Sequence, residues 1–208
     1  KIKDIANKNR IFLLEDCALT LGSKINGTIV GNFGDAALFS TDHSKPLNTL
    51  IGGLLYTKDH FLASRLKDSQ ARLPSLSKSR QSALLRRIMI ETHYCNPSRY
   101  GRLALIDIYE IVRKRYFGRS KDFLDEDSGV EEITSYPYPS KLPSFLAMIG
   151  LFEIARWKDV KQQRKDLLRS LIKIVMESNL SSVLPRCYTD PKLDIVPIRF
   201  ALNWEYSD

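Results

Sequence analysis

Residues 15–53 read EDCALTLGSKINGTIVGNFGDAALFSTDHSKPLNTLIGG and contain the pattern that decides the fold. An apolar run at 11–14 comes directly before them and ends at two carboxylates, the second of which is Asp16. A second apolar run, at 36–39, ends in a polar stretch that contains Lys45. Each run is typical of a buried parallel strand whose carboxyl end opens into a site. We therefore expect an α/β fold in which an acid and a lysine reach the same edge of a sheet.

Turn and helix signals predict the elements around these two strands. The Asn-Gly pair at 26–27 predicts a small hairpin with a short strand on each side. A third apolar run at 53–56 predicts another strand, and residues 58–72 repeat apolar positions at helical spacing. Ser144 is expected to cap a long amphipathic helix.

The last part of the chain has strand-like composition. Residues 185–202 are expected to form strands on either side of a turn at Asp190-Pro191. Within them, residues 196–200 alternate as an edge strand does, where a proline is tolerated.

An aspartate and a lysine at one sheet edge suit the chemistry of pyridoxal phosphate. A lysine amine binds the aldehyde of this cofactor covalently, and an aspartate keeps the pyridine nitrogen protonated so that the ring accepts electrons. A hydroxyl shortly before the lysine, such as that of Ser40, could bind the cofactor phosphate. A single Asp or Lys after a strand is more often a solvated loop residue, so these positions alone leave both interpretations open.

The same stretch resembles the DegT/DnrJ/EryC1/StrS family of sugar aminotransferases, which are fold-type I enzymes dependent on pyridoxal 5'-phosphate. Lys45 follows Asp16 by 29 residues, which is similar to the spacing in this family. The chain matches the family pattern in order at Asp16, Gly22, Gly31, Gly34, Asp35, Ser40, Lys45, Gly52 and Gly53.

The resemblance implies roles for individual residues. Lys45 looks like the catalytic lysine that holds the cofactor covalently and moves protons, Asp16 like the partner of the pyridine nitrogen, and Ser40 like a phosphate ligand. Leu19 stands where the family has a glutamine near the phenolic oxygen of the cofactor. His43 lies one position after the place of a family histidine, and both Leu19 and His43 are expected to border the cofactor.

The resemblance also implies a function. It predicts a transaminase that acts on a nucleotide-linked keto sugar in amino-sugar biosynthesis for a polysaccharide or glycoconjugate, with glutamate as amino donor and a homodimeric assembly. The alternative is a non-catalytic paralogue with a binding or scaffold role. Leu19, Thr41 and the lack of the family's asparagine before the helix at 144 keep this alternative open. A dehydratase of the family would carry histidine in place of Lys45.

The expected fold class is the carboxy-terminal part of a fold-type I transferase, with part of the large-domain sheet and a small α+β domain. We expect residues 1–72 to belong to the cofactor-binding large domain, 73–135 to form a helical insertion and 136–208 to form the small domain. Because the family has a long segment before its aspartate, the chain is expected to be a carboxy-terminal fragment that is inactive by itself.

Composition limits the remaining classes. The 208 residues are 43% hydrophobic and 27% charged, which is ordinary for a soluble globular protein. A net charge of +8 suits nucleic acid, an anionic membrane or a phosphorylated small molecule without choosing among them. The 3 cysteines are few and form no close pair, which favours a reducing compartment, and a cytoplasmic location is the expectation. Neither the cysteines nor the 3 histidines have metal-binding spacing. We expect no metal and no nucleic-acid partner. We also expect no membrane span, because no apolar run approaches the length of about 18 residues that a span needs.

Overall fold

The computed structural model describes residues 1–94, 108, 112, 115 and 139–203. Contacts group the chain into two compact units, one made of residues 1–69 and 144–208 and the other of residues 70–143. The assignment of 1–72, 73–135 and 136–208 to domains of a larger fold stays a prediction.

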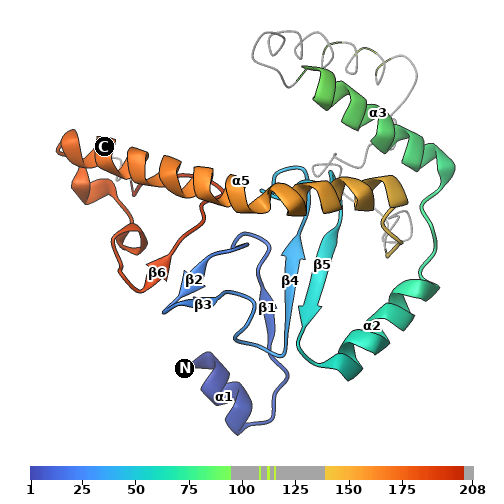
Figure 1. Ribbon diagram of the computed structural model, residues 1–208, viewed down its shortest axis with the longest axis horizontal. Helices are drawn as coiled ribbons and strands as arrows, with labels where there is room; N and C mark the ends of the chain where they lie inside the picture. The colour runs from blue at the N-terminus through green and yellow to red at the C-terminus, as the bar shows by residue number, and fades with distance from the viewer. Residues whose placement is uncertain (95–107, 109–111, 113–114, 116–138, 204–208) are drawn as a thin grey trace. The chain divides into compact units, whose positions relative to one another are not determined.

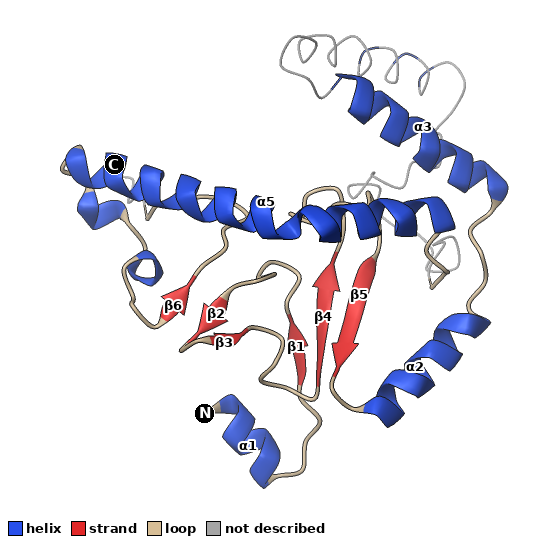
Figure 2. Ribbon diagram, viewed as in Figure 1, coloured by secondary structure: helices blue, strands red, loops and turns tan. Residues whose placement is uncertain are grey.

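The first unit contains two small sheets and most of the helices (Figures 1 and 2). Its elements are α1 (Ile2–Lys8), β1 (Leu14–Asp16), β2 (Lys24–Ile25), β3 (Thr28–Ile29), β4 (Ala36–Ser40), β5 (Gly53–Thr57), the beginning of α2 (His60–Arg72), α5 (Ser144–Glu177), the 3₁₀ turns η3 (Ser181–Val183) and η4 (Arg186–Tyr188), and β6 (Leu193–Asp194).

The first sheet has the strand order β1-β4-β5. β1 pairs in parallel with β4, with Asp16 opposite Leu38, and β4 pairs antiparallel with β5, with Ser40 opposite Gly53. Ala36 and Ala37 at the start of β4 are buried. The predicted parallel pair is confirmed, and the carboxyl ends of β1 and β4 therefore lie at the same edge (Figure 2).

The first strand differs from its prediction. It begins at Leu14 and includes both carboxylates, whereas the apolar run at 11–14 was expected to be the strand. Ile11 and Phe12 are each 58% exposed, so this run is not buried. Asp35 holds the chain just before the strand: its carboxylate accepts the Leu13 N–H at 2.7 Å, and its own N–H donates to the Leu13 carbonyl.

The second sheet has the order β3-β2-β6. The predicted hairpin at 24–30 is confirmed, since β2 and β3 pair antiparallel and positive φ angles at Asn26 (49°) and Gly27 (77°) turn the chain. β6 joins this hairpin across a long stretch of sequence, with Asp194 opposite Lys24.

The prediction of an edge strand at 196–200 is wrong. Residues 193–194 form the one strand in the described part of the segment after α5, and η3 and η4 precede it. Side chains take the backbone groups that a strand would use: Ser23 Oγ accepts the Val196 N–H at 3.0 Å, and the Arg164 guanidinium donates to the Pro197 carbonyl at 3.0 Å. Pro197 has no N–H to offer a neighbouring strand.

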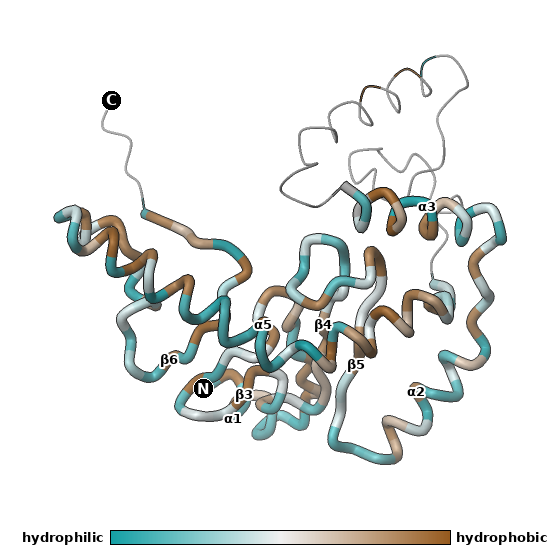
Figure 3. Tube along the Cα trace, turned by 45° about the horizontal axis from the view of Figure 1, so that its top comes forward, coloured by the Kyte–Doolittle hydropathy of each residue, from teal (hydrophilic) through white to brown (hydrophobic). Residues whose placement is uncertain are grey.

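α5 is the long helix predicted to begin at Ser144 and contains 34 residues. Leu146, Gly150 and Leu168 on it are buried, and Figure 3 shows apolar and polar stretches alternating along its length. A methyl group added at Gly150 would lie 3.1 Å from Thr49, in the loop after β4. One added at Gly22 would lie 2.9 Å from the Trp157 ring, so α5 packs closely against both segments.

The second unit contains α3 (Lys78–Tyr94). Leu84 of this helix and Leu76, just before it, are buried. The Gln81 side-chain amide donates to the Leu76 carbonyl at 2.7 Å, and Ser75 forms a parallel bridge with Lys141. Most of the predicted insertion beyond residue 94 lies outside the described residues. None of the helices in the described ranges is long and apolar enough to cross a membrane.

Candidate active site

Asp16 and Lys45 follow two neighbouring parallel strands. Asp16 is the last residue of β1, and Lys45 lies in the loop that begins where β4 ends at Ser40. The parallel pairing of β1 with β4 places both residues at one edge of the sheet. This edge is where open α/β sheets bind ligands.

Glu15 supports this edge by binding backbone rather than ligand. Its carboxylate accepts hydrogen bonds from the N–H groups of Gly31 (3.0 Å), Phe33 (2.7 Å) and Gly34 (2.6 Å). These contacts fix the connection between the hairpin and β4. Sequence reasoning noticed the acidic pair but did not assign this role; the glycines at 31 and 34 were the available signal.

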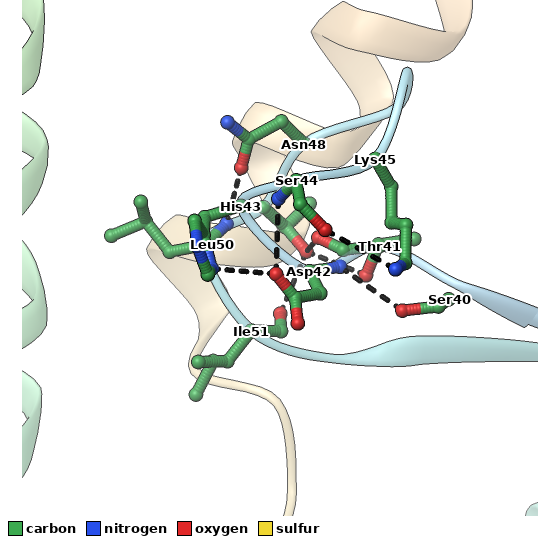
Figure 4. A network of polar contacts seen from close by, with 10 residues as sticks. Ser40, Thr41, Asp42, His43, Ser44, Lys45, Asn48, Leu50 and Ile51 are labelled. Atoms are coloured by element: carbon green, nitrogen blue, oxygen red, sulfur yellow. Dashed lines mark hydrogen bonds and ion pairs between the residues drawn. The ribbon is translucent and has the colours of Figure 1, made fainter. Parts of the chain in front are cut away.

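A buried hydroxyl pair holds the loop after β4. Thr41 and Thr49 are each 3% exposed, and their hydroxyl oxygens lie 2.7 Å apart. Thr49 Oγ1 also lies 2.7 Å from the Ile51 carbonyl, and the Thr49 N–H donates to the Thr41 carbonyl at 2.8 Å. Thr41 therefore stabilises the loop that carries Lys45 (Figure 4).

Within the described part of the chain, the Lys45 amine has one hydrogen-bond partner, the Ser44 hydroxyl at 3.2 Å. Its backbone N–H donates to the Asp42 carbonyl at 2.9 Å, which fixes the start of the side chain. Figure 4 shows the side chain directed back along the loop, with the amine beside Ser44. The amine is thus positioned without being neutralised by a carboxylate.

Asp16 keeps one oxygen for a ligand. Its Oδ1 accepts the Ala18 N–H at 3.0 Å, and Oδ2 forms no hydrogen bond with the described residues. The neighbouring Cys17 is 1% exposed, and burial raises the pKa of its thiol above the ordinary value. A neutral, buried thiol is a poor nucleophile, so Cys17 is a core residue here.

His43 lies apart from the Lys45 amine. Its Nδ1 is 2.6 Å from Asp42 Oδ1, which also accepts the Ser44 N–H at 3.0 Å. Figure 4 shows the imidazole on the other side of the loop from the Lys45 amine. This placement gives the Asp42–His43 pair a role in loop geometry, and an expected contact between His43 and the cofactor stays a prediction.

A cavity of about 640 Å³ lies beside Lys45. Leu19, Thr20, Ser44 and Lys45 form one side of it, and the hairpin and the segment after η4 form the others. Asp16, Ser40 and His43 do not line it. The structure therefore brings two of the predicted site residues, Leu19 and Lys45, to one cavity, and places Asp16 and Ser40 on the strand ends next to it.

Lys45 supplies an amine at this cavity that could hold the aldehyde of pyridoxal 5'-phosphate, because its one partner in the described part of the chain is the Ser44 hydroxyl. Asp16 and Ser40, which the resemblance assigns to the pyridine nitrogen and the phosphate, lie on the strand ends and do not line the cavity. No cluster of metal-binding side chains occurs among the residues that the structure describes.

The fold is that of an aminotransferase. The structure of the aminotransferase from Psychrobacter cryohalolentis aligns with 96% of this chain and 42% of its own, with a TM-score of 0.57 at 15% identity. This match confirms the predicted α/β fold class.

Sequence comparisons find relatives of the same kind. A model of the DegT/DnrJ/EryC1/StrS aminotransferase family matches residues 1–89. Over 65 residues, or 31% of this chain, it is 40% identical to the GDP-perosamine synthase of Escherichia coli O157:H7. Over 71 residues, or 34%, it is 38% identical to the L-glutamine:2-deoxy-scyllo-inosose aminotransferase of Streptomyces kanamyceticus. The matches span 18% and 17% of these relatives.

Proposed function

We propose that the whole protein is an aminotransferase dependent on pyridoxal 5'-phosphate, acting on a nucleotide-linked keto sugar with glutamate as amino donor. The observation that carries this proposal is the placement of Lys45. Its amine has no carboxylate partner in the described part of the structure. The residue lines the cavity and follows β4, which pairs with the strand that ends at Asp16.

The chemistry assigns distinct tasks to these residues. When bound, pyridoxal phosphate supplies an electron sink for negative charge at the reacting carbon. The Lys45 amine would hold the cofactor and then move a proton to and from substrate carbon as general base and acid. Asp16 Oδ2 would accept a hydrogen bond from the protonated pyridine nitrogen, and Ser40 would bind the phosphate. Lys45 needs its loop fixed for this work, which the Thr41–Thr49 pair provides.

The substrate class is supported by relatives rather than by geometry. The Escherichia coli relative is named for a GDP-linked amino sugar and the Streptomyces relative for an inosose. Both names imply amination of a ring carbonyl. A nucleotide-linked keto sugar, a part in polysaccharide or glycoconjugate synthesis, a homodimer and a cytoplasmic location complete the proposal.

A second candidate is a non-catalytic paralogue with a binding role. Two observations favour it: Asp16 does not line the cavity, and Leu19, which does, is an apolar residue 60% exposed where the family has glutamine. Such a protein would keep the cavity and lose the cofactor.

The test is the absorbance of the whole protein with added pyridoxal phosphate, before and after an amino donor. Lys45→Ala is compared with Lys158→Ala, which removes an exposed lysine of α5 that does not line the cavity. We expect a band that shifts with the donor, is lost in Lys45→Ala and persists in Lys158→Ala. Absence of any lysine-dependent band would contradict the enzyme and favour the paralogue.

A further inference from the structure

Among the described residues, the lining of the cavity beside Lys45 includes three cations and no carboxylate. Its charged lining residues are Lys24 of β2, Lys45 of the loop after β4, and Arg199 of the segment after β6. Three basic side chains around one concave surface attract an anion, and the low-dielectric walls strengthen that attraction.

Two carboxylates on neighbouring elements have other partners. Asp194 lies opposite Lys24 in the strand register, but its carboxylate lies 2.5 Å from the amine of Lys165 on α5. Lys24 acts on the same carboxylate through its charge and forms no ion pair with it among the described contacts. Both oxygens of Glu15 accept backbone N–H groups.

Arg164 of α5 and Arg199 of the segment after β6 have different contacts. Arg164 donates to the Pro197 carbonyl, which helps to hold the segment that carries Arg199. Arg199 itself is exposed and has no hydrogen bond or ion pair with the described residues. A guanidinium held by its backbone and free at its tip can bind a phosphate with two parallel hydrogen bonds.

Most of the remaining lining is apolar. Leu19, Ile25, Val30, Val196 and Ile198 contribute to it, and Tyr188, also on the wall, stacks on Phe200 with ring centroids 5.5 Å apart. Sites for small ligands commonly occupy about 300–1,000 Å³ and combine apolar walls with a few charged groups. The 640 Å³ cavity has this size and this lining.

We propose that Lys24 and Arg199 bind the diphosphate of a nucleotide-linked substrate in this cavity, whose wall also includes Lys45. The proposal rests on the proposed function for the identity of the ligand. It assigns substrate recognition to the hairpin and to the segment after β6, and it separates these residues from those that hold the cofactor.

Isothermal titration of the whole protein with GDP, pyrophosphate and guanosine tests the site. Lys24→Gln and Arg199→Gln should each weaken GDP and pyrophosphate binding about tenfold, the loss expected for one charge-assisted contact. Lys158→Gln and Arg169→Gln make the same charge changes on exposed parts of α5 and should leave binding unchanged. Guanosine should bind far more weakly than GDP.

Equal GDP binding by all four variants, or guanosine binding as tight as GDP binding, would overturn the proposal. A thermal unfolding curve for each variant confirms that the fold is kept. The absorbance of bound pyridoxal phosphate shows whether Arg199 binds the substrate diphosphate or the cofactor phosphate. Arg199→Gln should lower GDP affinity and leave the cofactor band of the whole protein intact. An Arg199-dependent GDP site without a Lys45-dependent band would keep this inference and contradict the aminotransferase; the reverse result would do the opposite.

Discussion

The loop and strand ends at 13–52 and the segment at 181–203 line the same cavity, yet they are held in different ways. In the first region most fixed contacts are close in sequence: Glu15 binds residues 31–34, and Thr49 binds Thr41 and Ile51. In the second region the contacts come from distant elements. Ser23 binds Val196 across 173 positions, and α5 binds the segment through Arg164 and Lys165.

This difference separates the two proposed tasks. The residues assigned to the cofactor lie on a scaffold that is largely tied to itself. Arg199, assigned to the substrate, lies on a segment whose position depends on α5 and on the hairpin. Damage to the first region should therefore cost more stability than damage to the ties of the second.

The largest effect is expected from Glu15→Ala. Three backbone N–H groups lose their acceptor, and unsatisfied donors cost about 1–3 kcal/mol each when buried, so we expect a loss of about 3 kcal/mol in the free energy of unfolding. Urea denaturation measures it. Glu15→Gln keeps one acceptor oxygen and should lose roughly half as much. An Ala variant as stable as the native chain would show that the scaffold does not depend on Glu15.

Gly31→Ala should have the next largest effect. Gly31 has a φ of +95°, and a methyl group there would lie 2.7 Å from the Phe39 ring. We expect a cost of about 2 kcal/mol, from the positive φ and from displacement of the ring. Gly27→Ala is the matched control, because φ is +77° but nothing lies within 4 Å, so it should cost only about 1 kcal/mol. Equal costs would show that the contact with Phe39 contributes nothing.

The smallest effect is expected at the ion pair between Lys165 of α5 and Asp194 of β6. A hydrogen bond from Lys165 lowers the pKa of Asp194 below its ordinary value of 3.8. A carboxyl with a lowered pKa stabilises the fold at pH values above its ordinary pKa, and this contribution is lost as the pH falls through its pKa in the folded state. Lys165→Gln should therefore lower Tm slightly at neutral pH, and the difference should vanish in acid.

Lys173→Gln serves as the control for that measurement. It breaks an exposed pair with Glu177 within α5, 3.6 Å apart, so its Tm should differ little from that of the native chain at any pH. A Lys165→Gln difference that persists unchanged in acid would contradict the linkage to Asp194.

Local patterns made much of the first region predictable. The Asn-Gly pair fixed the hairpin, and apolar runs that end in polar residues located β4 and β5. The same reasoning misplaced the strand at 196–200, because composition cannot show that Ser23 and Arg164 take the backbone groups of Val196 and Pro197. The role of Glu15 was missed for a related reason, since its partners are backbone amides that carry no side-chain signal.

By itself, the sequence determined the order of the strands along the chain, the parallel pair that sends Asp16 and Lys45 to one edge, and the resemblance to sugar aminotransferases, because these depend on residue spacing. The tertiary structure alone decided which of those residues share a cavity and that Lys24 and Arg199 join Lys45 there. The physical reason is that a cavity and its charge arise from segments far apart in sequence. Lys165 forms the ion pair with Asp194, so Lys24 on the facing strand acts on that carboxylate only through its charge, and no spacing in the chain encodes this arrangement.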